Sequence, residues 1–360
     1  MASCGFSHPE YDDSYTLDFD DRIIFNIDST TSRNSSQVGY SGDLNSIYLF
    51  NEVNYTLYFF DVDSRKNWNK IKLFKDGPLG INDVSKIYVV NIDSILTFST
   101  KSNILYLITE QGKKVTKHKV FSFENPDPTV QLRSSSVDYN KDTKEIFLPI
   151  RPNNRTDAER IKSVFSYSLE SQKKQFFQEW PEDFGEWGVK GILSYGTLNR
   201  TESKYIVSNT SDHQIHVTDL ELGSASSFYA GSDLIKAPNK YKGKGGVASR
   251  ILYQRTNSWY GNIYYDHNRK VYYRDAMIGS KIPKGNDPLA NQYPSLNGDD
   301  VFFTTIILDD SFKKIGEVKG LLLSDYVFSN DAGVYVRDYK FDRQNEDILV
   351  FSRYQLKSKK

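Results

Sequence analysis

The sequence predicts an all-β protein, a six-bladed β-propeller built from four-stranded antiparallel blades. Three observations indicate this fold. Tyr and Phe are abundant, with 25 and 22 residues among 360, and these side chains favour pleated, half-buried surfaces. Short apolar runs recur at spacings of 48 to 66 residues, somewhat above the usual period of propeller blades. Turn-forming residues separate these runs, and no helical period extends over four turns.

Each repeat contains an apolar strand, a second apolar strand and a third, more polar strand. The clearest copy reads SILTFST, ILYLIT and KKVTKHKVF between residues 94 and 121. One further strand precedes most copies, so each unit has four strands, as a propeller blade does. The first apolar strands of the six copies begin at Ile47, Ile95, Ile146, Tyr205, Val271 and Val334.

The last repeat ends after its third strand, DILVFSRYQL, near the C-terminus. Two unassigned strands, YTLDF (residues 15–19) and RIIFNI (residues 22–27), lie near the N-terminus. We expect one of them to complete the last blade, because this closes the ring and removes an open sheet edge. Two stacked β-sandwiches are the alternative, but they would need a linker near the middle of the chain, where no Pro-, Gly- or Ser-rich segment lies.

Charge and composition exclude several classes of protein. The 46 Lys and Arg balance the 46 Asp and Glu, which argues against a dedicated nucleic-acid-binding protein. No run approaches 18 apolar residues, so no membrane-spanning helix is predicted. No GxSxG, HExxH, Walker or EF-hand motif occurs in the sequence. No catalytic residue, metal site or cofactor is therefore predicted.

The single cysteine, Cys4, lies in an N-terminal segment whose residues suggest lipid attachment. Small residues precede it, Gly5 follows it, and this pattern is similar to the processing site of a bacterial lipoprotein. We expect residues 1–13 to form a flexible tether with a lipid-modified Cys4, and residues 14–360 to form one propeller. The alternative is a free cysteine on a disordered terminus.

The lengths of the connections predict where a ligand binds. The turns between first and second strands, and between third and fourth strands, are short, whereas the other connections are long, as in residues 151–162, 180–191, 230–247 and 277–299. Long loops on a rigid scaffold commonly carry binding sites, so we expect a ligand on the long-loop face near the channel mouth. Aromatic rings and arginines suit this role by stacking and by paired hydrogen bonds, although each ring could instead pack between blades. The predicted contacts are Arg250, Tyr253, Trp259, Tyr260, Arg274, Arg151, Trp180 and Trp187.

Other polar residues suggest an alternative function, a Ca²⁺-dependent enzyme. Asp138, Asp266 and Asp325 could reach the axis and hold Ca²⁺, as in propeller lactonases and sugar dehydrogenases. His213 and His216 are three residues apart in a predicted strand, so they face opposite sides and favour a structural role.

Several segments resemble a known family. YGNIYYDHNRKVYYRDA (residues 260–276), VFFTTIILDDSFKKIGEV (residues 301–318) and KDGPLGI (residues 75–81) are similar to an uncharacterised Bacteroidetes lipoprotein family of unknown function with a TolB-like six-bladed propeller. The resemblance implies export to the cell envelope and an outer-membrane anchor at a cysteine placed like Cys4. It implies no catalytic residues.

These observations favour a lipid-anchored binding or interaction module whose partner is a glycan, a peptide or an envelope protein. Nucleic acid is not expected as a partner, and membrane contact is expected only through the anchor. A Ca²⁺-dependent hydrolase or dehydrogenase and a purely structural envelope component are the other hypotheses.

Overall fold

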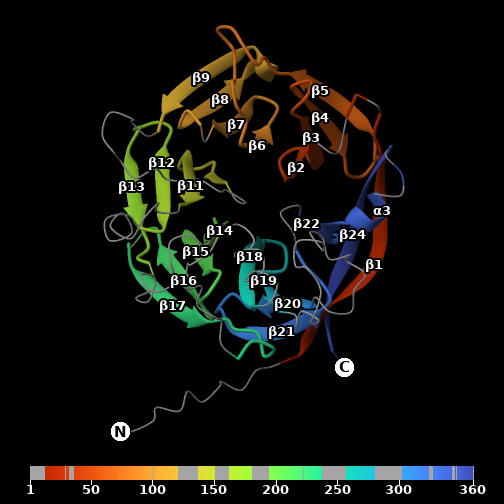
Figure 1. Ribbon diagram of the computed structural model, residues 1–360, viewed down its shortest axis with the longest axis vertical. Helices are drawn as coiled ribbons and strands as arrows, with labels where there is room; N and C mark the ends of the chain where they lie inside the picture. The colour runs from red at the N-terminus through yellow and green to blue at the C-terminus, as the bar shows by residue number, and fades with distance from the viewer. Residues whose placement is uncertain are drawn as a thin grey trace, which may run out of the picture.

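The computed structural model contains six four-stranded blades arranged around a common axis, as the sequence predicts (Figure 1). It describes residues 13–28, 30–31, 36–99, 101–120, 137–150, 162–180, 194–221, 223–236, 257–279, 302–323, 327–342, 345 and 347–359. Every blade is an antiparallel meander that runs from the axis outward.

The strands of each blade are named here in order from the axis. Blade 1 contains β2 (Ser36–Ser41), β3 (Ser46–Asn51), β4 (Thr56–Asp61) and β5 (Asn67–Lys72). Blade 2 contains β6 (Lys86–Asn91), β7 (Ser94–Ser99), β8 (Ile104–Thr109) and β9 (Lys114–Lys119). Blade 3 contains β10 (Asp138–Asn140), β11 (Glu145–Pro149), β12 (Val164–Ser168) and β13 (Lys174–Phe177).

The second half of the ring follows the same plan. Blade 4 contains β14 (Ser194–Asn199), β15 (Lys204–Asn209), β16 (Gln214–Asp219) and β17 (Ala225–Tyr229). Blade 5 contains β18 (Trp259–Asp266), β19 (Val271–Ile278), β20 (Phe302–Leu308) and β21 (Lys314–Lys319). Blade 6 contains β22 (Val327–Asn330), β23 (Gly333–Arg337), β24 (Ile348–Ser358) and β1 (Tyr15–Asn26). Two short helices accompany the strands in the described residues, η2 (Glu110–Gly112) and α3 (Tyr339–Asp342).

The hydrophobic core is divided into layers between neighbouring blades. In blade 1 the two middle strands, β3 and β4, are almost wholly buried, whereas the outer strand β5 is mostly exposed. The middle strands pack against a blade on each side, which explains their continuous apolar runs. Six apolar clusters occur among the described residues, one at each junction between adjacent blades. The layer between blades 6 and 1 completes the ring.

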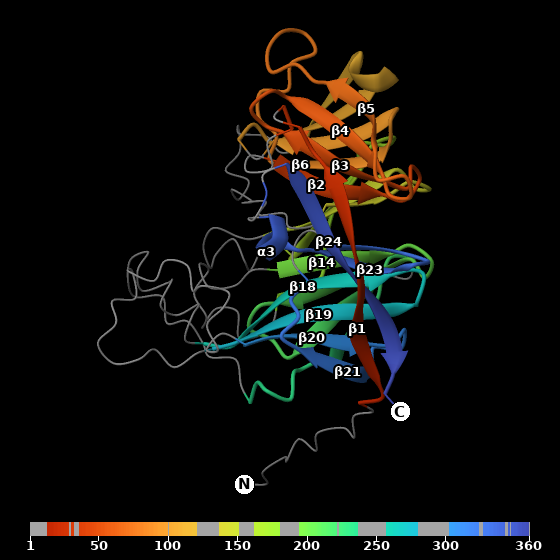
Figure 2. The same ribbon diagram turned by 90° about the vertical axis from the view of Figure 1, so that its right-hand side faces the viewer.

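The strand β1 closes the ring, as the sequence predicts. It pairs antiparallel with β24 from Tyr15–Ser358 to Asn26–Ile348, and the two strands lie side by side in Figure 2. The two predicted N-terminal strands form one continuous strand here, with an irregularity between Phe19 and Asp21. Tyr15 also pairs with Gly316 of β21, so blades 5 and 6 share one eight-stranded sheet.

The short turns after the innermost strands have a common cause. An Asn or Asp ends the innermost strand in five blades, and its side chain accepts a hydrogen bond from an amide two or three residues later. Such Asx turns reverse the chain within a few residues. The predicted turns at residues 140–142 and 266–268 are of this kind. The four long connections named above fall largely outside the described residues. Within the described part of the chain, no helix is long and apolar enough to cross a membrane.

Candidate functional site

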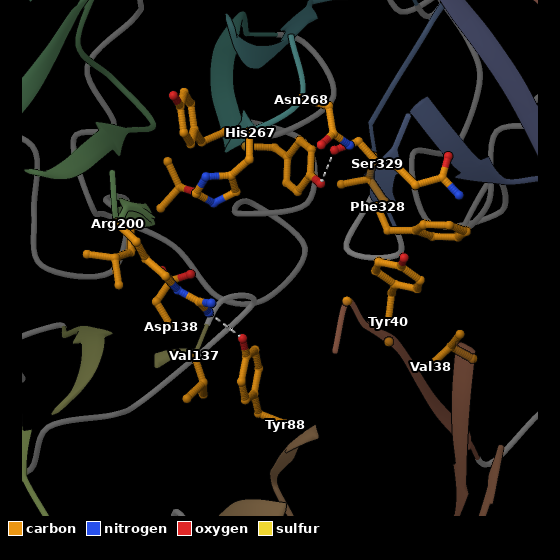
Figure 3. A pocket seen from close by; sticks show the side chains of 18 of the residues that line it. Val38, Tyr40, Tyr88, Val137, Asp138, Arg200, His267, Asn268, Phe328 and Ser329 are labelled. Carbon is orange, nitrogen blue, oxygen red and sulfur yellow. Dashed lines mark hydrogen bonds between the residues drawn. The ribbon is translucent and has the colours of Figure 1, made fainter. Parts of the chain in front are cut away.

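A cavity of about 770 Å³ lies on the propeller axis (Figure 3). Its walls come from the innermost strands of all six blades and from the Asx turns that follow several of them. Because each strand contributes only a few residues, the cavity exists only in the closed ring. Its volume lies in the range typical of small-molecule sites.

Glycines shape two of the walls. A Cβ atom at Gly39 would lie 2.2 Å from the Tyr48 hydroxyl, and one at Gly196 would lie 2.2 Å from the Tyr205 hydroxyl. The rings from the second strands therefore lie over the inner strands where these have no side chain. The Tyr48 hydroxyl donates to the carbonyl of Ile87 in the next blade, at 3.2 Å. Glycine at these positions thus lets a tyrosine connect adjacent blades beside the cavity.

One wall of the cavity is aromatic. Tyr40 of blade 1 stacks on Phe328 of blade 6, with ring centroids 4.4 Å apart and an interplanar angle of 19°. Phe328 stacks in turn on Tyr335 at 4.6 Å. The Tyr40 hydroxyl donates to Asn45 Oδ1 at 3.0 Å, which fixes the ring at the turn end of the cavity. Tyr40 and Tyr335 thus both stack on the buried Phe328 ring, and Tyr40 is the partly exposed ring of this wall.

A second wall, from blades 2, 3 and 4, is polar and charged. Arg200 Nη2 donates to the Tyr88 hydroxyl at 2.7 Å, so a side chain of blade 4 reaches one of blade 2 (Figure 3). Asp138, the first residue of β10, lies beside this pair and is partly exposed to the cavity. Among the described residues, Asp138 Oδ2 has no hydrogen-bond partner. Asp138, Arg200 and Tyr88 are called the polar cluster below.

Burial and nearby charge shift the pKa values of side chains on this wall. Burial raises the pKa of Asp138 to about 7, although the Arg200 charge, the Leu198 amide and the Tyr205 hydroxyl oppose this rise. Burial, together with the Arg200 charge, lowers the pKa of His267, so this imidazole is neutral at pH 7. The polar cluster can therefore donate or accept protons near neutral pH, and its fixed charge is the Arg200 guanidinium.

The structure brings together two of the residues predicted as ligand contacts, but inside the protein. Arg274 is fully buried, and its guanidinium lies 3.9 Å from the centroid of the Tyr260 ring. It donates to Ser208 Oγ and to five main-chain carbonyls. The Tyr260 hydroxyl lies 2.6 Å from His213 Nδ1 and accepts from the Ser232 amide at 3.2 Å. Both side chains thus join blades 4 and 5, and their role in ligand binding stays a prediction.

The other predicted contacts lie at the long-loop end or outside the described residues. Trp180 follows β13, Trp259 begins β18, and both are half-buried. The residues of the prediction that lie outside the described part of the chain are Cys4, Arg151, Trp187, Arg250 and Tyr253.

The two candidate axial carboxylates that the structure describes, Asp138 and Asp266, do not converge on the cavity. Asp138 lines the cavity, whereas Asp266 is buried, pairs with Arg269 at 3.0 Å and forms its own Asx turn. Asp325 lies outside the described residues. No three His, Cys, Asp or Glu side chains of the described chain are placed to hold a metal ion. His216 is hydrogen-bonded to Asp212 at 2.8 Å and to Ser227 at 2.9 Å.

Sequence reasoning missed most of the cavity. Tyr40, Tyr88, Arg200 and Phe328 lie on or directly after innermost strands, whereas the prediction favoured the long loops. One sequence signal could have indicated these cavity residues. When six innermost strands are arranged radially, residues at or just before the short turns that follow them face the axis. Asp138, the first residue of β10, was named in the prediction only as a carboxylate that could reach the axis.

The fold and cavity define a class of protein, a six-bladed β-propeller with an axial ligand-sized cavity. Within this class, the chain belongs to the family described as domain of unknown function DUF4221, whose model matches residues 10–319. A solved structure of a DUF4221 member from Bacteroides vulgatus is 21% identical, covers 96% of this chain and 99% of its own, and gives a TM-score of 0.73. A Bacteroides fragilis protein described as a candidate exported protein is 11% identical, covers 97% and 99%, and gives a TM-score of 0.55. No curated protein sequence matches the chain.

Proposed function

We propose that this protein is a ligand-binding propeller of the cell envelope that binds a saccharide in its axial cavity. The observation that carries the proposal is the pairing of an aromatic wall with a polar cluster across one cavity. Sugar rings present C–H faces that pack on aromatic rings, and hydroxyl groups that bond to carboxyl, guanidinium and amide groups. A folded peptide or an envelope protein would need a larger surface than this cavity offers.

The location in the envelope rests on two supports. The structurally similar Bacteroides fragilis protein is described as a candidate exported protein. The residues around Cys4 are similar to a lipoprotein processing site. We therefore propose lipid attachment at Cys4, and membrane fractionation of cells that express wild-type protein or Cys4→Ser tests it. Equal membrane association of both proteins would contradict the anchor.

Isothermal titration calorimetry against a panel of mono- and disaccharides tests the binding site. Tyr40→Ala removes half of the stacked pair, and we expect about two- to tenfold weaker binding, because contacts with aromatic rings contribute roughly 0.5–1.5 kcal/mol. Trp259→Ala changes the long-loop end, and Trp68→Ala, on the outer strand β5 and 46% exposed, is the control. The last two variants should bind as wild type does.

The same series distinguishes the two ends of the channel. Loss of binding in Trp259→Ala with normal binding in Tyr40→Ala would place the ligand on the long-loop face. Binding of peptides but of no saccharide would show that the ligand is a peptide and not a saccharide. No saccharide binding at millimolar concentration would contradict the proposed function.

A further inference from the structure

Arg200 is an unusual group to find beside a cavity, because it has no carboxylate partner there. Its Nη2 atom donates to a neutral tyrosine hydroxyl, and no carboxylate lies within 4.0 Å of the guanidinium in the described part of the chain. Guanidinium groups in such partly buried positions are most often paired with carboxylate or phosphate. The Tyr88 hydroxyl fixes the direction of Arg200 without neutralising it.

Asp138 lies beside this cation, yet it forms no ion pair with it. Asp138 lines the cavity, whereas its Oδ2 atom is buried and has no hydrogen-bond partner among the described residues. A carboxyl group that is protonated can donate one hydrogen bond, whereas an ionised one can only accept. The polar cluster therefore places a guanidinium without a carboxylate partner and a carboxyl group on the same wall.

The charges around the cavity are unequally distributed. Asp63 and Asp331 line the side formed by blades 1 and 6, and Lys86 and Arg200 line the side formed by blades 2 to 4. An anionic group would be repelled from the first side and attracted to the second. The titratable groups that face Asp138 or its immediate neighbours are Asp43, Tyr48, Lys86, Tyr88, Tyr139, Arg200, Tyr205 and His267.

We propose that the ligand is an acidic saccharide whose carboxylate binds between Arg200 and the protonated carboxyl of Asp138. One carboxylate oxygen accepts from the guanidinium, the other accepts from the Asp138 hydroxyl, and the sugar ring extends toward Tyr40 and Phe328. The proposal rests on the proposed function, since it specifies the saccharide that the same cavity binds. It also explains why Arg200 is held by a neutral group, because a resident carboxylate would compete with the ligand.

The titration behaviour agrees with this arrangement. Burial raises the pKa of Asp138 to about 7, so the protonated form is abundant at pH 6 and scarce at pH 8.5. Burial and Arg200 lower the pKa of His267 from its ordinary value, and burial raises the pKa values of Tyr88 and Tyr205, so the two tyrosines stay neutral over the same interval. Asp138 is thus the group whose charge changes most in this window.

Calorimetry with D-glucuronate, its methyl ester and D-glucose between pH 6 and pH 8.5 tests the proposal. At pH 6 we expect glucuronate to bind at least tenfold more tightly than the ester or glucose. In wild-type protein this affinity should fall by about tenfold per pH unit above pH 7 as Asp138 ionises. Asp138→Asn keeps an N–H donor at this position, so its affinity should stay near the wild-type value at pH 6 throughout the range.

The Arg200 variants provide the matched comparison. Arg200→Gln should lose at least tenfold in affinity for glucuronate and little for the ester, and Arg200→Lys should keep part of the difference. Circular dichroism melting curves establish that each variant is folded at both pH values. If Arg200→Gln does not fold, Arg200→Lys and Asp138→Asn still decide the result.

Four outcomes would overturn the proposal. Equal affinities for glucuronate, its methyl ester and glucose would show that the site does not recognise the acidic group, while the proposed binding of saccharides would still hold. Weaker binding by Asp138→Asn at every pH would show that the ionised carboxylate accepts from the ligand. Equal binding of acetate or benzoate would show a simple anion site, and no saccharide binding at all would contradict the proposed function as well.

Discussion

Arg274 shows how a charged residue can serve as a core residue. It is fully buried, it pairs with no carboxylate among the described residues, and burial lowers its pKa to about 10. Its guanidinium donates hydrogen bonds to the main-chain carbonyls of Asn209, Asp212, His213, Gln214 and Ala230. These carbonyls lie in the connection between β15 and β16 and after β17, so a single side chain of blade 5 satisfies the polar backbone of blade 4.

Replacing Arg274 should therefore destabilise the protein strongly. Arg274→Met keeps the apolar stem but leaves five carbonyls without their donor, and we expect the free energy of unfolding to fall by about 3–5 kcal/mol. Arg274→Lys retains three donors and should lose less. Urea unfolding followed by tryptophan fluorescence measures both, with the exposed Arg65→Met as control. A loss below about 1 kcal/mol in Arg274→Met would show that the carbonyls find other donors.

Asp138 should make stability depend on pH. Its pKa is raised to about 7 in the folded state, from an ordinary value of 3.8 in the unfolded state. Below pH 3.8 both states bind the proton, so the contribution to stability is complete there. Between pH 4 and pH 7 the unfolded state ionises first, so the free energy of unfolding falls as the pH rises, and above pH 7 the loss is complete.

Asp138→Asn should remove this dependence. We expect it to match wild type near pH 4 and to exceed it at pH 8 by on the order of 2 kcal/mol, a reduced value because the carboxyl is partly exposed to the cavity. Urea unfolding of both proteins at pH 4, 6 and 8 measures the difference. A constant difference across these pH values would show that the carboxyl titrates normally.

At the scale of elements, the sequence predicted the strands best where both faces are buried. The middle strands of each blade are continuous apolar runs, so β3, β7, β11, β15, β19 and β23 begin within one residue of the predicted starts. The innermost strand β2, SQVGYS, was missed because it has few apolar residues: Gln37 and Ser41 hydrogen-bond to blade 2, and Gly39 lies against the Tyr48 ring. Asp20 and Asp21 separate the two predicted N-terminal strands, but Arg353 binds both carboxylates across the strand pair, at 2.7 and 3.8 Å, and β1 is continuous.

The candidate site was less predictable for a physical reason. Tyr40, Tyr88 and Arg200 are separated by 48 and 112 residues, and only the closed ring brings their short strands to one cavity. Periodicity within a strand states which residues share a face, but it does not state which faces meet around an axis. Arg274 was predicted as a ligand contact, and no sequence pattern indicated that its guanidinium is buried against main-chain carbonyls of blade 4.

Among the strands, β1 is the one whose removal we expect to lower the stability of the protein most. It completes blade 6 and buries Leu17, Ile23 and Phe25, each of which is at most 4% exposed. A chain that starts at Asp28 loses these contacts, and we expect the free energy of unfolding to fall by about 5 kcal/mol or more. A chain that starts at Asp13 keeps β1 and is the reference. Thermal melting compares the two, and restoration by a peptide of residues 13–27 would attribute the loss to β1; equal melting temperatures would contradict the closure.

At the scale of the whole molecule, the seam between β1 and β24 is the one blade pairing that joins the two ends of the chain. Successive strands of the other blades are joined by the chain itself, so opening this seam is the simplest way to open the ring. The seam also holds blade 6 against blades 1 and 5 through two apolar layers. We therefore expect ring opening at β1 to precede or accompany the unfolding of every blade.

A disulfide across the seam tests this expectation. The Lys359 amide donates to the Ser14 carbonyl, so the neighbouring pair Tyr15–Ser358 is a non-hydrogen-bonded pair, whose Cα atoms lie close together. Tyr15→Cys with Ser358→Cys, in a Cys4→Ser background, closes a loop of about 340 residues, and we expect a gain of about 2–4 kcal/mol over the same protein when reduced. Urea unfolding with and without dithiothreitol measures the gain, and the two single cysteine variants should show none. If the oxidised and reduced proteins unfold at the same urea concentration, the seam does not limit the stability of the ring, and unfolding begins within a blade.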